Sequence, residues 1–123
     1  MGNLYFWLKK RMTEKFKVEF LAEAVEFMDS LDQKSQQKIY YNIKKAQLTN
    51  DPELFKKIND NIWEFRTFYN KTHFRIFAFW DKTQGQQTLV LSTHGLIKKT
   101  DRTPKTDLEK AERIREQYFA QKK

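Results

Sequence analysis

Apolar and polar positions follow two different periods along the first third of the chain. Residues 16–20 alternate between apolar and charged side chains, which predicts a short, half-buried β-strand. From Leu21 to Leu31 the apolar residues recur at spacings of three and four, as on one face of an amphipathic helix. A second helix is predicted to start after Asp32, whose carboxylate can cap free backbone N–H groups, and the short connection predicts an antiparallel helical hairpin. The apolar face of this second helix contains Ile39, Tyr40, Ile43 and Ala46.

Capping residues predict two further helical segments. Asp51 followed by Pro52 offers a cap and a proline at the first helical position, which predicts a short turn of helix through Lys57. Thr106 and Glu109 have the spacing of a capping box, so a last amphipathic helix is expected to begin there.

Between these segments the period changes to two. Residues 62–69, 72–80 and 87–94 are rich in aromatic and β-branched side chains, and each is predicted to form a strand. Asn70 and Lys71 make a connection short enough for a tight hairpin, so the three strands form an antiparallel meander. Because helices cluster before this meander, the predicted fold class is α+β: an N-terminal strand and a helical hairpin pack on the meander, and a C-terminal helix follows.

The composition is that of one small domain with an aromatic core. The chain has 123 residues, enough for one domain, and 15% of them are aromatic. Residues 1–12 are set apart as an N-terminal extension or tag-like segment, and residues 13–123 form the single domain. Cysteine is absent, which excludes disulfides, thiolate metal ligands and cysteine nucleophiles. No apolar run approaches the roughly 20 residues that cross a bilayer, so no membrane partner is expected.

Positive charge is concentrated in one region. The formal net charge is +8, and residues 62–106 carry eight Lys or Arg against three Asp or Glu. A small basic domain commonly binds nucleic acid, an acidic protein or a membrane surface. The charge therefore directs the search for a site to the meander and the segment that follows it.

Two arginines are predicted to face each other across the first hairpin. A turn at Asn70 and Lys71 places Arg66 opposite Arg75, on the sheet face that also carries Glu64. Like charges in directly opposite positions are normally destabilising. The pair is therefore either neutralised by Glu64 or kept to hold an anion. We expect this face to be partly open to solvent.

Further basic and aromatic residues are candidates for binding a phosphate backbone. His94 is predicted to end the third strand, and cations follow it directly, so these side chains are expected to converge at the strand end. Arg and Lys neutralise phosphates, and exposed aromatic rings can stack on bases. The alternatives are that the aromatic rings belong to the core and that His94 has a structural hydrogen-bonding role. The candidates are Phe68, Lys71, His94, Lys98, Lys99, Arg102 and Lys105.

Other chemistries lack support in the sequence. His73 and His94 are the only histidines, and without cysteine they disfavour a zinc site. There is no Gly-rich phosphate loop and no serine-nucleophile motif. A pair of catalytic histidines would have to use His73, which lies beside a hairpin turn without a supporting pattern. No cofactor is expected.

Several short motifs together resemble a known family. They are Ile62–Arg66 (IWEFR), His73–Ile76 (HFRI), His94–Thr100 (HGLIKKT) and Thr103-Pro104 before the last helix. In order and spacing they resemble the RelE/ParE superfamily of toxin–antitoxin toxins, specifically its phage-related HigB-type branch. The resemblance implies a RelE-like, microbial ribonuclease-like fold and metal-independent endoribonuclease activity on mRNA in the ribosome. It also implies a cytoplasmic protein whose partners are the ribosome, mRNA and a cognate helix-turn-helix antitoxin.

The resemblance also suggests roles for individual residues. Arg75 matches the arginine that the family uses at the scissile phosphate, and Arg66 matches a basic residue on the preceding strand. Lys98 and Lys99 match a basic pair after the last strand, and His94 matches a histidine typical of the branch. The tyrosine that some relatives place near the terminal helix start is missing here, so the general acid and base stay open between His94 and the two lysines.

Two other functions stay open. A non-enzymatic protein of the ParE type, which inhibits DNA gyrase, would have the same fold. A relative whose catalytic site has decayed would keep the binding surface only. The clustered cations and His94 favour RNA cleavage, because an inhibitor that binds a protein needs no convergent phosphate site.

Overall fold

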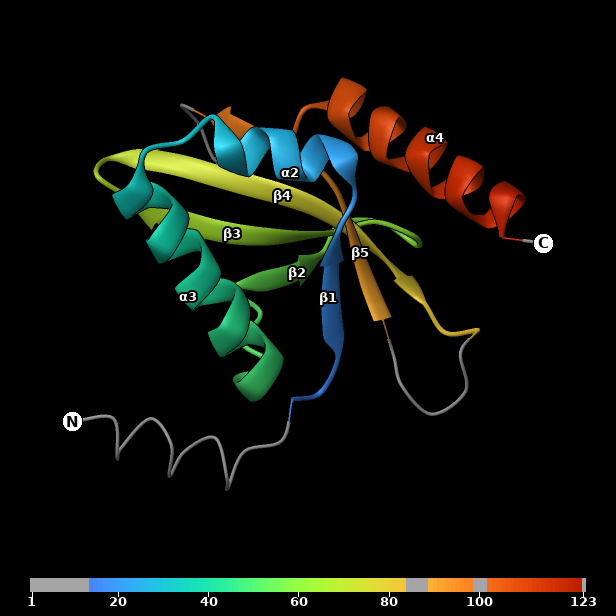
Figure 1. The fold of residues 1–123 in the computed structure, drawn as a ribbon, viewed down its shortest axis with the longest axis horizontal. Coiled ribbons are helices and arrows are strands. Elements are labelled where there is room, and N and C mark those ends of the chain that lie inside the picture. Colours follow the sequence, from blue (N-terminus) through green and yellow to red (C-terminus); the bar gives the residue numbers. More distant parts are fainter. Residues whose placement is uncertain (1–13, 84–88, 99–101, 123) are drawn as a thin grey trace.

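One mixed five-stranded sheet runs through the molecule, with helices on both of its faces (Figure 1). A computed structural model describes residues 14–83, 89–98 and 102–122; the N-terminal extension and Lys99 lie outside this part of the chain. The sheet order is β1-β5-β4-β3-β2, in which β1 pairs parallel with β5 and the other neighbours pair antiparallel. The strands are β1 (Lys17–Phe20), β2 (Phe55–Lys57), β3 (Trp63–Tyr69), β4 (Thr72–Asp81) and β5 (Leu89–Lys98).

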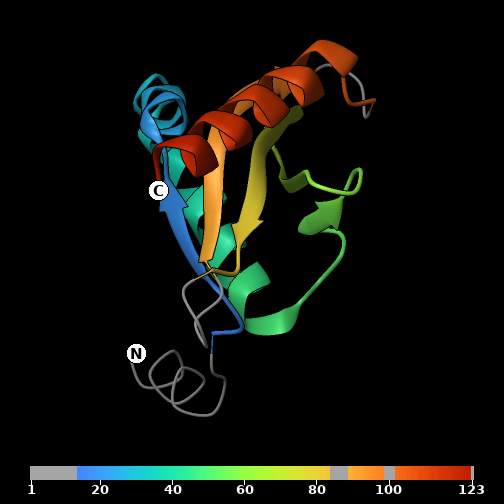
Figure 2. The same cartoon turned by 90° about the vertical axis from the view of Figure 1, so that its right-hand side faces the viewer.

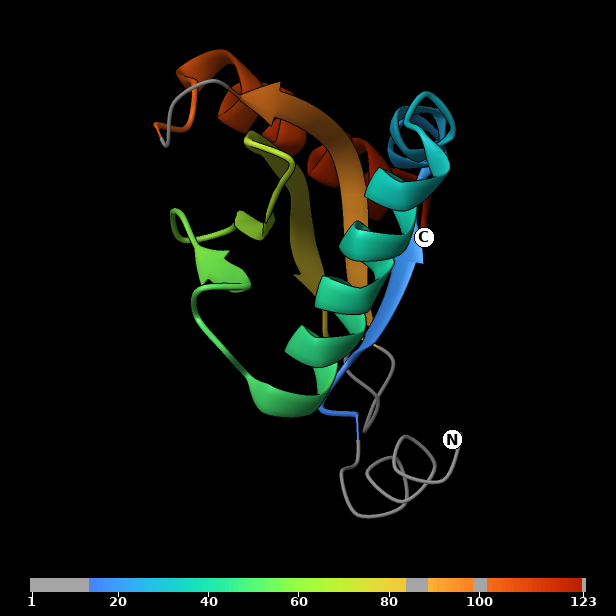
Figure 3. The same cartoon turned by 90° about the vertical axis from the view of Figure 1, so that its left-hand side faces the viewer.

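Among the described residues, three helices complete the fold, which confirms the α+β class. They are α2 (Ala22–Asp29), α3 (Gln33–Thr49) and α4 (Lys105–Gln121). Figures 2 and 3 view the sheet from opposite sides, with α4 in front in the first and α3 in front in the second. Within the described residues, no helix is long and apolar enough to cross a membrane.

Each sheet face has its own hydrophobic cluster. Phe65, Ile76 and Ala78 face α2 and α3, where they pack with Met28 and Ile39. On the other face, Ile62, Phe77, Phe79 and Leu91 pack against Ala111 of α4. Successive side chains of β3 and β4 point to opposite faces of the sheet. Because helices cover part of both faces, these side chains enter two separate hydrophobic clusters.

Local signals in the sequence set the start of α3 and the first hairpin of the meander. Asp32 caps α3 as predicted: its carboxylate accepts from the backbone N–H of Ser35 at 3.2 Å and from the Ser35 hydroxyl at 2.6 Å. The hairpin between β3 and β4 also forms as predicted, with φ of 51° at Asn70 and 58° at Lys71. Its register places Arg66 opposite Arg75.

Three predictions about residues 21–57 are wrong. Residues 55–57 form β2 instead of a helical turn, because the Phe55 ring stacks on Phe65 at 4.2 Å and the backbone pairs with β3. Tyr40, predicted in the apolar face of α3, is 51% exposed. The two helices also contact different strands, α2 mainly β5 and α3 mainly β3, instead of packing along each other as a hairpin.

The boundaries of the last two elements also differ from the prediction. β5 continues past His94 to Lys98, with Gly95 opposite Ile76. A side chain at Gly95 would collide with the Phe27 ring, so this glycine allows α2 to lie against β5. α4 begins at Lys105 after Pro104, and no side chain caps it, so the predicted Thr106 box does not form.

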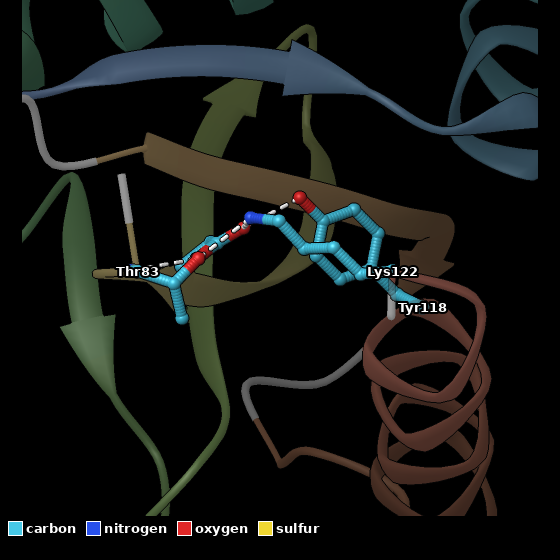
Figure 4. A network of polar contacts seen from close by, with 4 residues as sticks. Thr83, Tyr118 and Lys122 are labelled. Atoms are coloured by element: carbon cyan, nitrogen blue, oxygen red, sulfur yellow. Dashed lines mark hydrogen bonds and ion pairs between the residues drawn. The ribbon is translucent and has the colours of Figure 1, made fainter. Parts of the chain in front are cut away.

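The C-terminal end of α4 is fixed to the end of β4 by a polar network (Figure 4). The Tyr118 hydroxyl donates to the carboxylate of Asp81 at 2.6 Å, and the ammonium group of Lys122 donates to the same oxygen. The Thr83 hydroxyl donates to the other oxygen of Asp81 at 2.6 Å. Asp81 is fully buried, so these donors replace the water that its charge has lost.

Candidate functional site

A buried carboxylate lies at the centre of the basic face. Glu64 on β3 is 2% exposed, and its Oε2 lies 3.3 Å from Nε of Arg66 and 3.4 Å from Nε of Arg75. The Thr103 hydroxyl donates to the other carboxylate oxygen at 3.1 Å. Glu64 therefore neutralises the two opposed arginines and holds the segment that leads into α4.

Arg75 is not on an open face, which corrects the sequence-based expectation. It is 2% exposed, and its Nη1 donates to the carbonyl oxygen of Phe74 at 3.1 Å. Arg66 stays partly exposed. The reason for the difference is that Thr103 and the first turn of α4 contact this end of the sheet, a long-range contact that strand alternation cannot reveal.

His94 lies beneath the start of α4 with both ring nitrogens occupied. It is 3% exposed; its Nε2 is 3.1 Å from a carboxylate oxygen of Asp107, and its Nδ1 is 3.0 Å from the Thr93 hydroxyl. Burial lowers the pKa of His94, an effect that Asp107 opposes and Lys110 reinforces. The ring is therefore neutral near pH 7, with Nε2–H donating to Asp107 and Nδ1 accepting from Thr93. This arrangement connects β5 to α4.

The predicted site residues on the three meander strands lie in adjacent rows on one face. Cross-strand partners share a face, and the side chain two residues along a strand points the same way. The predicted convergence of His94 with the cations that follow it at a strand end does not occur, because β5 continues to Lys98, and His94 and Lys98 lie two rows apart on the same face as Arg66 and Arg75. The rows are Glu64, Phe77 and His94; then Arg66, Arg75 and Leu96; then Phe68, His73 and Lys98.

The remaining candidates differ in their surroundings. Lys98 is buried at the end of β5, whereas Lys71 is exposed in the hairpin turn. Arg102 and Lys105 are exposed beside the start of α4, and the Lys105 ammonium lies 4.0 Å from Glu109. Lys99 lies outside the described residues.

A groove of about 650 Å³ opens beside these rows. It is bordered by α3, by the turn before β2 and by β3 and β4. Four cationic side chains and two carboxylates line it, so the lining is electropositive, and His73 adds an imidazole. Phe68 is 60% exposed, with its ring centroid 4.6 Å from that of His73. The charged lining residues are Lys38, Lys45, Arg66, Arg75, Asp51 and Glu53.

Sequence reasoning missed the contribution of α3 to this groove. Lys38 and Lys45 are both part of the groove wall. Asn42 lies between them and donates to the Thr67 hydroxyl at 3.1 Å. Positions 38, 42 and 45 lie on one face of the helix. Their polar side chains were therefore a signal in the sequence that α3 contributes to the groove. His73, set aside because it adjoins the turn, lines the same groove.

Comparison with known proteins gives the family of the chain. The family model of phage-derived Gp49-like proteins (DUF891) matches residues 26–116, which include α3, the strands β2 to β5 and most of α4. The chain belongs to the Gp49-like family. This family is associated with RelE-like toxins in general. A search of curated proteins gives no match.

The Gp49-like match includes all of the polar groups around Glu64 and the groove, from Lys38 to Asp107. Within the described ranges, no three His, Cys, Asp or Glu side chains lie close enough together to hold a metal ion. The chemistry that this site can offer comes from its guanidinium, ammonium and imidazole groups. These groups suit an anionic, phosphate-containing ligand.

Proposed function

We propose that this Gp49-like protein is the toxin of a type II toxin–antitoxin system, and that it cleaves mRNA on the ribosome. The observation that carries the proposal is the electropositive groove, in which partly exposed Arg66 and His73 adjoin an exposed aromatic ring, Phe68. Cations that contact phosphate beside a ring that can stack on a base are the elements of single-strand RNA binding. The α+β fold and the family's association with RelE-like toxins support the same function.

The reaction that suits these groups needs no metal. The 2′-hydroxyl oxygen of a ribose attacks the adjacent phosphorus, the bond from phosphorus to the 5′-oxygen breaks, and a 2′,3′-cyclic phosphate and a 5′-hydroxyl result. A base takes the 2′-hydroxyl proton, an acid supplies a proton to the leaving oxygen, and cations stabilise the charge that develops on phosphorus-bound oxygens. We assign the charge stabilisation to Arg66, supported by Arg75, which lies opposite it on β4.

His73 is our candidate for proton transfer. Its imidazole lines the groove, and imidazole is the side chain suited to exchanging protons near neutral pH. His94 has both nitrogens in hydrogen bonds under α4, which favours a positioning role for it. Lys98 is the register neighbour of His73 and is retained as the competing base, together with Lys99.

The proposal includes partners. The ribosome would position the mRNA, so cleavage of naked RNA should be much slower than cleavage of translated RNA. A helix-turn-helix antitoxin with an acidic segment would bind the basic face, and its association should slow as salt rises. With these partners, the proposed place of action is the cytoplasm.

The deciding experiment is cleavage of mRNA on programmed ribosomes, with mapping of the new 5′ ends. Wild-type protein should cut within the translated frame, and Arg66→Gln should lower the rate roughly 100-fold or more, as loss of one charge-stabilising donor does. Arg113→Gln, an exposed arginine on α4, is the control and should cleave normally. Intact mRNA with all three proteins would reject the nuclease proposal. A parallel supercoiling assay would then test gyrase inhibition, the second candidate.

A further inference from the structure

A second cavity is lined by the same segment, residues 50–61, that borders the groove. Its volume is about 460 Å³, which is within the range of small-molecule sites. Two tryptophans, Trp63 of β3 and Trp80 of β4, form part of its wall. Three cations also line it, Lys57, Lys82 and Arg115, against one carboxylate, Asp60.

The two tryptophans form an accessible aromatic platform. Their ring centroids are 5.4 Å apart at an interplanar angle of 78°, and both side chains are partly exposed. The Lys82 ammonium lies 5.6 Å from the centroid of Trp80, so one face of that ring already attracts a cation. The Trp80 indole N–H has no acceptor among the described residues, a penalty that a phenylalanine in the same position would avoid.

We propose that this cavity holds one nucleotide of the RNA strand whose cleaved part occupies the groove. The inference rests on the proposed function for the identity of the strand. The base would stack on the tryptophan platform, and the phosphate would lie between Lys82 and Arg115. An acidic peptide could use the cations, but it would make no use of the exposed parts of the two indole rings, so the combination favours a nucleotide.

The two cavities meet around one edge of the sheet. Trp63 lines the second cavity and Arg66 lines the groove, and because they are three positions apart on β3 their side chains point to opposite faces of the sheet. One continuous RNA strand would therefore pass around the edge strand, β2. Residues 50–61 contribute to both cavities, so an RNA strand would cross β2, where Lys56 and Lys57 are exposed.

Binding of an uncleavable RNA tests the inference without depending on catalysis. The probe is a fluorescently labelled 2′-O-methyl hexanucleotide, and the readout is its anisotropy with full-length protein at several salt concentrations. Arg115→Gln and Lys82→Gln should each weaken binding about fivefold and reduce the slope of log affinity against log salt by roughly 0.7. Arg113→Gln removes the same kind of charge from the same helix but lies outside the cavity, so it should bind within about twofold of wild type.

Competition experiments distinguish an RNA strand in the second cavity from a mononucleotide or an acidic peptide. The hexanucleotide should bind more tightly than adenosine monophosphate, and a hexaglutamate peptide should compete weakly. Equal binding of the mononucleotide, or a peptide whose binding shows the same dependence on Arg115 and Lys82, would overturn the inference, as would wild-type affinity in both variants. A protein that binds RNA with the expected pattern but leaves mRNA intact on ribosomes would support the inference and reject only the nuclease proposal.

Discussion

Glu64 shows how one carboxylate makes a basic face compatible with folding. Two arginines in directly opposite positions on adjacent strands would repel each other. The buried Glu64 carboxylate lies within 3.4 Å of a guanidinium nitrogen of each. Because Glu64 neutralises the pair from the adjacent row of the same face, Arg66 can keep part of its side chain exposed toward the groove. The arginine pair is thus neutralised by Glu64, as one of the two alternatives at the level of sequence required, while only Arg66 keeps an exposed part that an anion could contact.

Replacing Glu64 by Gln should destabilise the protein strongly. The substitution keeps the shape of the side chain but removes the charge that compensates the buried Arg75, and breaking a buried ion pair typically costs about 3 kcal/mol or more. Urea denaturation measures the change in the free energy of unfolding. Glu53→Gln, an exposed carboxylate at the groove, is the control and should change stability by less than about 0.5 kcal/mol. A Glu64→Gln protein as stable as wild type would show that the ion pairs contribute little.

His94 should make stability dependent on pH below neutrality. Its pKa in the folded protein is lowered, first by burial, whereas an unfolded chain has the ordinary value of about 6.5. The unfolded state therefore binds more protons as the pH falls through 6.5, and the free energy of unfolding should decrease from that pH downward.

The measurement is urea denaturation at pH 7.5 and pH 5.5. His94→Gln should remove most of the decrease, whereas His73→Gln should retain it. An unchanged pH dependence in His94→Gln would contradict the assignment. The charged groups that act on the ring, Asp107, Lys110 and Glu23, stay in place in both variants.

At the scale of elements, α4 is held at both ends by polar contacts across the sheet. At its start, Asp107 contacts His94; at its end, Tyr118 and Lys122 contact Asp81. Burial acts to raise the pKa of Asp81, but donors from Lys122, Thr83 and Tyr118 outweigh it and lower that pKa well below its ordinary value. The Asp81 carboxylate thus stays ionised and holds the helix over the second hydrophobic cluster.

Tyr118→Phe should therefore loosen α4 without changing its apolar packing. The variant loses a hydrogen bond to a buried charge, which is worth about 1.5–3 kcal/mol in unfolding free energy. Tyr41→Phe removes a hydroxyl from an exposed tyrosine and should have almost no effect. Denaturation curves for the two variants give the comparison. Equal stabilities would mean that Lys122 and Thr83 satisfy Asp81 without Tyr118.

Elements were predictable where their signals are local. The Asp32 cap, the Asn70-Lys71 turn and the alternation of β3 and β4 depend on neighbouring residues, and all were predicted correctly. Residues 55–57 were mistaken for a helix because their strand conformation depends on pairing with β3. The contact between Asp81 and Tyr118 spans 37 positions, and no local pattern announces it.

At the scale of the whole molecule, the sequence predicts which residues share a face but not what covers that face. The hairpin register follows from the turn, so Arg66, Arg75 and Glu64 could be grouped correctly. Their burial depends on where α4 lies, and the groove depends on how α3 crosses β3. The sequence located positive charge in residues 62–106, whereas the groove also takes cations from α3.

Because the groove takes cations from α3 as well as from the sheet, its local charge can be changed separately from the net charge. This allows a test of whether local or total charge guides RNA to the site. Lys38→Gln with Lys45→Gln removes two cations from the groove wall, and Lys15→Gln with Lys34→Gln removes two exposed cations that do not line it. Both double variants have the same net charge. A groove that focuses its field should lose roughly tenfold in cleavage rate on programmed ribosomes when its own cations are removed, and the loss should shrink as salt rises. The Lys15 and Lys34 variant should cleave at close to the wild-type rate. Equal losses in the two variants would mean that the charge of the whole surface, and not the groove between α3 and β3, attracts the RNA.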